Sequence, residues 1–267
     1  MSNPFLQLIK RKDLPGGYAA GTWIMSASPV VIEALGCAGF DWGVVDMEHS
    51  PLDLMNTVHM LQACAGTPMV PITRIPWNDA VMVKRMLDAG AQTLLFPFVQ
   101  NAQEAQQAVA AAKYPPVGIR GMAAMSRASR FGTKPNYFKT ANDDVAVIVQ
   151  IETTAAVEQT QAIASTPGVD ALFIGPGDLS GTMGHVGELT HPAVMDQIAK
   201  AIAACHQAGK PIGTVGGTPE VVATYRKMGF DFIACGSDLG LLMRNCAATL
   251  SAMRAQAIEP ASQPQGY

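Results

Sequence analysis

Short apolar segments alternate with longer amphipathic segments along most of the chain. The short segments are rich in β-branched residues and predict strands at 19–25, 43–46, 69–73, 93–97, 145–151, 170–174, 211–215 and 231–235. The longer segments carry apolar residues at helical spacing and predict helices at 29–38, 53–65, 78–89, 101–112, 154–164, 191–208, 218–228 and 238–254. Continuously apolar strands of this kind are typical of a parallel sheet that is buried on both faces.

Eight strands, each followed by a helix, predict a single (β/α)₈ TIM barrel over residues 1–254. A doubly wound sheet is the alternative, but no G-x-G-x-x-G turn follows the first predicted strand. An insertion at residues 113–144 interrupts the alternation, and long insertions usually form binding loops or subunit contacts. Residues 255–267 are expected to form a disordered tail.

The composition narrows the class of protein. Of 267 residues, 49% are hydrophobic and 15% are charged, so a large core is available and a disordered chain is excluded. The net charge is -3 without a cluster of Lys and Arg, which argues against a nucleic-acid partner. The chain has no apolar run of the roughly 18 residues that a membrane span needs, and its N-terminus does not resemble a signal peptide. The five cysteines include no C-x-x-C pair and favour a reducing, cytoplasmic location.

Charged residues gather where predicted strands end. The second strand is followed by Asp46-Met47-Glu48-His49, and Arg74, Glu152 and Asp178 follow the third, fifth and sixth strands. In a barrel of this type the active site lies at the carboxyl ends of the strands. The sequence therefore predicts that these side chains converge on one rim.

Glu152 and Asp178 are the predicted metal ligands, because two carboxylates and water suit a hard dication such as Mg²⁺ or Mn²⁺. The alternative is that one of them pairs with Arg74 or caps the next helix. His49 is the candidate general acid or base, and its alternative is a structural hydrogen bond within its loop. Arg74 offers a planar fork for a carboxylate or an enolate oxygen, unless it forms a structural ion pair. None of the nine lysines lies at a carboxyl end, so a Schiff-base mechanism is not expected.

Five motifs, in this order, resemble the HpcH/HpaI aldolase family, the metal-dependent class II pyruvate aldolases that are built on a (β/α)₈ barrel. They are AGFDWGVVDMEHSP (38–51), LDAGAQTLLFP (87–97), YPPVGIRG (114–121), VQIE (149–152) and FIGPGDLS (173–180). The resemblance extends over roughly residues 18–254. It implies retro-aldol cleavage of 4-hydroxy-2-oxo acids, such as 4-hydroxy-2-oxoheptanedioate or 2-dehydro-3-deoxyglucarate, to pyruvate and an aldehyde.

The resemblance also implies roles for individual residues. Glu152 and Asp178 match the ligands of a divalent metal (Mg²⁺, Mn²⁺ or Co²⁺), Arg74 matches the arginine that stabilises the pyruvate enolate, and His49 matches the catalytic histidine. Asp88 matches an acid that forms a dyad with that histidine, although the residues alone place it inside or just after a helix. Positions that bind substrate are Trp23, Gln150, Gly177, Asp178 and Val215.

Two further properties follow from the resemblance. The family forms homo-hexamers, dimers of trimers, in which the last helix is swapped between neighbours, and the apolar helix 238–254 is compatible with that arrangement. Residues 122–130 and the segment after the seventh strand depart from the family pattern, which leaves the identity of the aldehyde open.

Two other functions are considered. A lyase that acts on a CoA thioester would need a basic surface for the nucleotide, and the chain has few clustered Lys or Arg residues. A non-catalytic relative of the fold would not need to retain Glu152, Asp178, Arg74 and His49 together.

Overall fold

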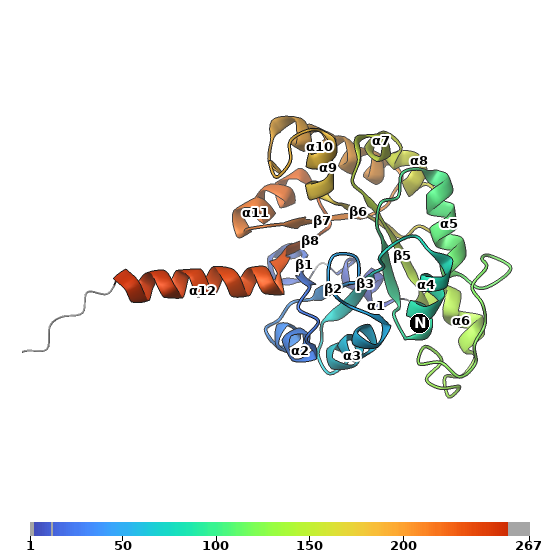
Figure 1. The fold of residues 1–267 in the computed structure, drawn as a ribbon. Helices are drawn as coiled ribbons and strands as arrows, with labels where there is room; N and C mark the ends of the chain where they lie inside the picture. Colours follow the sequence, from blue (N-terminus) through green and yellow to red (C-terminus); the bar gives the residue numbers. More distant parts are fainter. Residues whose placement is uncertain (1–2, 12, 256–267) are drawn as a thin grey trace, which may run out of the picture.

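The computed structural model describes residues 3–11 and 13–255, which form a closed barrel of eight parallel strands (Figure 1). Each strand pairs with the next one in the chain, and β8 closes the ring by pairing with β1. The strands are β1 Ala19–Ile24, β2 Trp42–Asp46, β3 Val70–Arg74, β4 Thr93–Phe96, β5 Ala146–Ile151, β6 Ala171–Ile174, β7 Ile212–Gly216 and β8 Phe232–Ser237. The predicted TIM barrel is confirmed, and each predicted strand overlaps an observed one.

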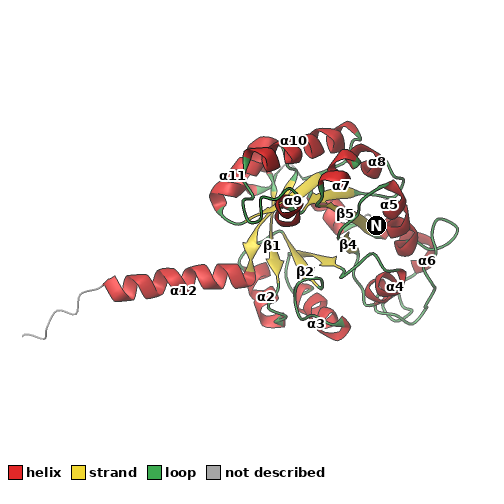
Figure 2. Cartoon of the chain, turned by 45° about the horizontal axis from the view of Figure 1, so that its top comes forward, coloured by secondary structure: helices red, strands yellow, loops and turns green. Residues whose placement is uncertain are grey.

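Helices connect successive strands and surround the barrel (Figure 2). Those that overlap single predicted helices are α2 Pro29–Cys37, α3 Leu54–Cys64, α4 Ala80–Asp88, α5 Ala102–Ala112, α10 Pro192–Gln207, α11 Pro219–Met228 and α12 Asp238–Ala255. The helix predicted at 154–164 is two short helices, α7 Thr154–Glu158 and α8 Thr160–Ala164, which meet at Gln159. A 3₁₀ turn at Pro15–Gly17 precedes β1.

Polar side chains determine where several of these helices begin. Each accepts a hydrogen bond from a backbone N–H in the first turn of its helix, a group that the helix itself leaves unpaired. These N-caps are Ser28, Asp53, Asp79, Asn101, Thr153 and Thr218. Because all of them precede helices that start at the carboxyl ends of strands, they anchor the loops of that edge.

Three helices were not predicted: α1 Pro4–Leu8, α6 Tyr137–Asp144 and α9 Pro176–Thr182. The first closes the amino edge of the barrel, where Phe5 is fully buried against Trp42 and Phe232, with ring centroids 5.9 and 5.1 Å away. A helix of five residues is too short to show a period. Its contacts with distant residues explain its formation.

The last helix, α12, stands away from the barrel (Figure 1). Its first residue, Asp238, is buried and accepts hydrogen bonds from the backbone N–H groups of Met25 and Ser26. Beyond that turn its apolar side chains, including Leu242 and Met253, are exposed. Neither α12 nor any other helix in the described ranges is long and apolar enough to cross a membrane. The predicted tail lies outside the described residues except for Ala255, which ends α12.

Candidate active site

The predicted site residues that follow strands lie on the carboxyl edge of the barrel. Asp46 and Arg74 are the last residues of β2 and β3, and their strands pair at this point. Glu152 directly follows β5, and Asp178 is in the first turn of α9, four residues after β6. Because all eight strands run in parallel, these positions share one edge.

Arg74 is buried and is held by two carboxylates. Its Nε and Nη2 donate to the two oxygens of Asp46 at 2.9 and 2.7 Å, and its Nη1 lies 2.9 Å from a carboxylate oxygen of Glu48. The guanidinium carbon is 5.2 Å from the centre of the Trp23 ring. Arg74 therefore forms the structural ion pair that is its alternative role, and it does so with Asp46 and Glu48 rather than with Glu152 or Asp178. Because carboxylates hold it on two sides, the guanidinium of Arg74 is fixed in one orientation.

Glu152 is almost fully buried and forms no ion pair with any described residue. One carboxylate oxygen accepts from the backbone N–H of Phe98 at 2.7 Å, and the other accepts from Nε2 of Gln150. Burial raises the pKa of Glu152 to about 7; the two hydrogen bonds oppose this shift, and the nearby charges of Asp178 and Glu48 add to it. The carboxyl group is therefore placed where a cation would stabilise its ionised form.

Asp178 is exposed at the start of α9 and makes none of the hydrogen bonds expected of a helix cap. Its charge raises the pKa of both Glu152 and Glu48, although burial is the larger cause in each case. The charge of Asp178 therefore acts on both of these carboxylates. Glu152 and Asp178 thus supply oxygen ligands without a cationic partner among the described side chains, and this donor set fits Mg²⁺, Mn²⁺ or Co²⁺.

A pocket of about 280 Å³ opens beside these groups. Its lining includes Arg74 and all five positions predicted to bind substrate: Trp23, Gln150, Gly177, Asp178 and Val215. The side-chain oxygen of Gln150 is buried and has no hydrogen-bond partner, so the pocket contains an acceptor that a ligand can satisfy. At Gly175 a Cβ atom would lie 2.5 Å from the Glu152 carboxylate, so only glycine fits beside it.

Neither His49 nor Asp88 is among the residues that line this pocket. The His49 side chain is 60% exposed, and its Nε2 is 3.8 Å from a carboxylate oxygen of Glu48. Asp88 is the last residue of α4, and a helix that follows a barrel strand runs back to the amino edge. There it accepts a hydrogen bond from Arg120 at 2.8 Å. Within one chain the structure does not bring the predicted dyad together.

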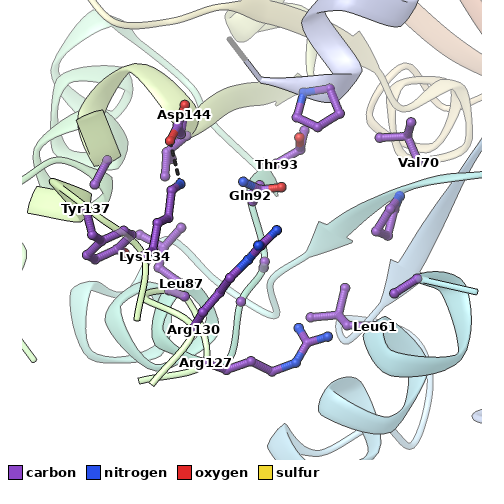
Figure 3. Close-up of a pocket in the computed structure, with 18 of the residues that line it drawn as sticks. Leu61, Val70, Leu87, Gln92, Thr93, Arg127, Arg130, Lys134, Tyr137 and Asp144 are labelled. Carbon is purple, nitrogen blue, oxygen red and sulfur yellow. Dashed lines mark hydrogen bonds and ion pairs between the residues drawn. The ribbon is translucent and has the colours of Figure 1, made fainter. Parts of the chain in front are cut away.

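A second, larger pocket belongs to the amino edge, and its lining contains none of the carboxylates described above. It measures about 970 Å³ and is lined by Arg127, Arg130 and Lys134 together with apolar residues such as Leu61 and Leu87. Figure 3 shows the two arginine side chains extending into it, while Lys134 pairs with Asp144. Cavity size therefore does not identify the functional end of this barrel.

Sequence reasoning assigned no role to Asp46, Glu48 or the backbone of Phe98. The string Asp46-Met47-Glu48-His49 marked a strand end, but side-chain orientation decides which of its members faces Arg74. Phe98 has a left-handed backbone (φ 54°), which is unusual for a residue with a side chain and turns its N–H toward Glu152. No sequence signal predicts that conformation at a phenylalanine.

Comparisons with known proteins agree with this geometry. The family model described as HpcH/HpaI aldolase/citrate lyase matches residues 19–245. A 2-dehydro-3,6-dideoxy-6-sulfogluconate aldolase of Pseudomonas putida is 49% identical over 247 residues, which cover 92% of this chain and 95% of that protein. A 5-keto-4-deoxy-D-glucarate aldolase of Salmonella newport is 44% identical and covers 82% of this chain and 86% of its own.

The fold agrees as well. A solved structure of an HpcH/HpaI aldolase/citrate lyase family protein from Burkholderia cenocepacia superposes with a TM-score of 0.90 at 39% identity. The match covers 95% of this chain and all of the other chain.

Proposed function

The chain belongs to the HpcH/HpaI aldolase/citrate lyase family, and on this basis we propose that its carboxyl edge cleaves 4-hydroxy-2-oxo acids to pyruvate and an aldehyde. It is a carbon–carbon lyase of the aldolase type. One observation carries the proposal: a buried Glu152 and a nearby Asp178, both without a cationic partner among the described residues, flank a pocket that holds a charged Arg74 and an unpaired amide oxygen of Gln150.

In this proposal Glu152 and Asp178 hold a divalent cation, Mg²⁺, Mn²⁺ or Co²⁺. The chemistry that the cation supplies when bound is polarisation of the 2-oxo group. Gln150 holds one oxygen of Glu152 through its Nε2, and the Phe98 N–H holds the other, so the carboxylate is oriented before any ligand arrives.

Arg74 stabilises the charge that develops during cleavage. A base removes the proton of the C4 hydroxyl, the C3–C4 bond breaks, the aldehyde leaves, and the bond's electrons pass into the enolate of pyruvate. Protonation at C3 then gives pyruvate. The guanidinium, fixed by Asp46 and Glu48, faces the pocket in which this enolate oxygen would lie. Fixed donors need no rearrangement as the charge forms.

His49 is the proposed base, with Asp88 as the acid that orients it. Since the two residues lie at opposite edges of one barrel, such a dyad requires His49 of one chain and Asp88 of another. The projecting helix α12, with its exposed apolar side chains, supports an oligomer in which it packs on a neighbour. We propose the homo-hexamer, a dimer of trimers with a swapped last helix, that the family resemblance implies.

The aldehyde half of the substrate is proposed from the relatives. They are named for 5-keto-4-deoxy-D-glucarate and for 2-dehydro-3,6-dideoxy-6-sulfogluconate. Both substrates carry an anionic group at the end that leaves as the aldehyde, and we propose a substrate of this class. The five cysteines are all free, which suits the reducing cytoplasm as the proposed location.

The test is pyruvate release, coupled to lactate dehydrogenase, from each of these two substrates and from 4-hydroxy-2-oxoheptanedioate. Protein stripped with EDTA should be inactive and should recover with Mg²⁺, Mn²⁺ or Co²⁺. Treatment with borohydride in the presence of pyruvate should leave activity unchanged, because no lysine forms an imine. Activity that survives EDTA would overturn the metal assignment. Absence of pyruvate from every substrate with every metal would overturn the aldolase proposal and favour a CoA-thioester substrate.

A further inference from the structure

The loop between α9 and α10 brings three potential metal ligands together. His185, Glu188 and His191 are spaced three residues apart. The N–H of Glu188 donates to the carbonyl of His185, and the N–H of His191 donates to the carbonyl of Glu188, both at 2.9 Å. Two successive turns of this kind return every third residue to the same side. Gly184 and Gly187 adopt the left-handed backbone that such a compact path requires.

The side chains of the three residues meet on that side. Their ligand atoms all lie within 4.8 Å of one another, which is true of no other group of three or more His, Cys, Asp or Glu in residues 3–11 and 13–255. The two imidazole rings are stacked with centroids 3.6 Å apart, and Nδ1 of His185 is 3.9 Å from a carboxylate oxygen of Glu188. His185 is 30% and Glu188 64% exposed, so an ion in solution can reach them.

Structural roles account for only part of this arrangement. Nδ1 of His191 accepts a long hydrogen bond, 3.3 Å, from the N–H of Ala193 and so caps α10. That bond gives no reason for His185 to stack on the same ring or for Glu188 to approach both. A bound metal ion would compete with the Ala193 N–H for Nδ1 of His191. One imidazole ring would then rotate about its Cβ–Cγ bond, so that one nitrogen lone pair of each ring points at the ion.

We propose that His185, Glu188 and His191 form a second metal site, for a transition-metal dication such as Zn²⁺. Two imidazoles and one carboxylate form a common three-ligand set for such ions and leave a position for water. Glu152 and Asp178 offer only oxygen and suit harder ions. The two sites are separate, because Asp178 lies in the first turn of α9 and His185 follows the other end of that helix. The proposal does not depend on the proposed function.

An ion in this site would connect the two helices on either side of the loop. His185 follows the end of α9, whose first turn carries Asp178 and lines the pocket, and His191 is the N-cap residue of α10. We therefore assign the second site a bracing role for α9.

The experiment is a Zn²⁺ titration of tag-free protein after EDTA treatment, with bound metal measured after equilibrium dialysis. Wild type should bind one more Zn²⁺ per chain than His185→Ala, and Glu152→Ala should keep that ion. His185→Ala and Glu188→Gln should weaken the second site by at least about 100-fold, because loss of a ligand costs more than loss of its outer partner. Co²⁺ provides an independent readout, since a mixed nitrogen–oxygen site absorbs visible light more strongly than an octahedral oxygen site.

Two control variants complete the design. His59→Ala removes an exposed histidine of α3 and should change nothing. His49→Ala tests whether the second ion binds beside Glu48 instead. His185→Ala should also keep its Mg²⁺-supported pyruvate release, so a failure of the aldolase proposal stays distinguishable. An equal number of bound Zn²⁺ in wild type and His185→Ala, or loss of the same Zn²⁺ in His49→Ala, would overturn the proposed site.

Discussion

The two edges of the barrel differ in how their charged side chains are paired. At the amino edge, Asn3 is fully buried and every hydrogen-bonding group of its side chain has a partner, while Asp88 pairs with Arg120. At the carboxyl edge, Glu152 has no counter-charge among the described residues and the Gln150 oxygen has no partner. The larger cavity belongs to the first edge and the smaller pocket to the second. The uncompensated charge of Glu152, rather than cavity volume, distinguishes the edge at which we propose the reaction.

The largest effect is expected from Glu152→Ala. It removes a proposed metal ligand and should lower kcat/KM by at least about a thousandfold. The free energy of unfolding should change little, because relief of a carboxyl whose ionisation burial opposes offsets the loss of its hydrogen bonds from Phe98 and Gln150. Pyruvate-release kinetics and urea denaturation of the same sample measure both. Glu158→Ala, an exposed carboxylate on α7, is the matched control; an equal loss of activity there would contradict the assignment.

Arg74→Lys should lower activity less than Glu152→Ala does, and its effect should be on kcat. Lysine keeps the charge and loses the fork that Asp46 and Glu48 hold, so we expect kcat to fall by about 10²–10³-fold. Metal affinity, measured by calorimetry, should stay within about threefold because Arg74 is not a ligand. A variant in which only KM rises would indicate that Arg74 binds substrate without stabilising the enolate.

At the amino edge the same kind of substitution should affect stability alone. Asn3→Ala removes the donor to the carbonyls of Gln92 and Asp144 and the acceptor that caps α1 at the N–H groups of Phe5 and Leu6. We expect the free energy of unfolding to drop by about 2–3 kcal/mol, with kcat unchanged at a temperature where the variant is folded. Equilibrium urea unfolding gives the first quantity. A large fall in kcat of the folded variant would show that the edges are coupled.

The pH dependence of metal binding gives a smaller, graded effect. Burial raises the pKa of Glu152 from 4.5 to about 7, so below this value a proton occupies the carboxylate that the metal needs. Affinity should fall by up to about tenfold for each pH unit below 7 and level off above it. The metal-free fold should correspondingly lose stability as the pH rises from 4.5 through 7, since the unfolded chain gives up this proton first. Calorimetry from pH 5.5 to 8 tests the slope, and Glu152→Gln should abolish it.

The smallest expected effect is the activity regained when His49 variant chains and Asp88 variant chains assemble together. If His49 and Asp88 meet between chains, co-expressed His49→Ala and Asp88→Asn chains should regain about a quarter of wild-type activity, the fraction of interfaces at which both residues are intact. Each variant alone should be far less active. Mixed oligomers that stay as inactive as their parents would show that the dyad does not form across an interface.

Much of the fold follows from pattern alone. The eight strands were predicted to within about two residues because their apolar runs are long and are separated by turn signals. The break at Gln159 and the helices α1, α6 and α9 were not predicted. For α9, the Gly175-Pro176-Gly177-Asp178 string reads as a flexible loop, whereas Pro176 in fact occupies the first helical turn.

The candidate site was predictable to the level of strand ends. Parallel strands bring Arg74, Glu152 and Asp178 to one edge whatever their side chains do. The partners of Arg74, the left-handed Phe98 and the pairing of Asp88 with Arg120 depend on side-chain and loop geometry that no spacing rule encodes. Among the residues taken from the family resemblance, Asp88 is the one that the fold places at the opposite edge.

The carboxylates around Arg74 also determine the order in which metal and substrate bind. Asp46 and Glu48 hold the guanidinium of Arg74, and Glu152 and Asp178 add two further carboxylates at this edge, so the side chains around the pocket carry an excess of negative charge. A 2-oxo acid is itself an anion and is repelled by that field until a dication reverses it. We therefore expect compulsory-order kinetics, with metal first and substrate second, and no detectable binding of pyruvate to the EDTA-treated protein. The concentration of the free cation would then limit how much substrate the protein can bind.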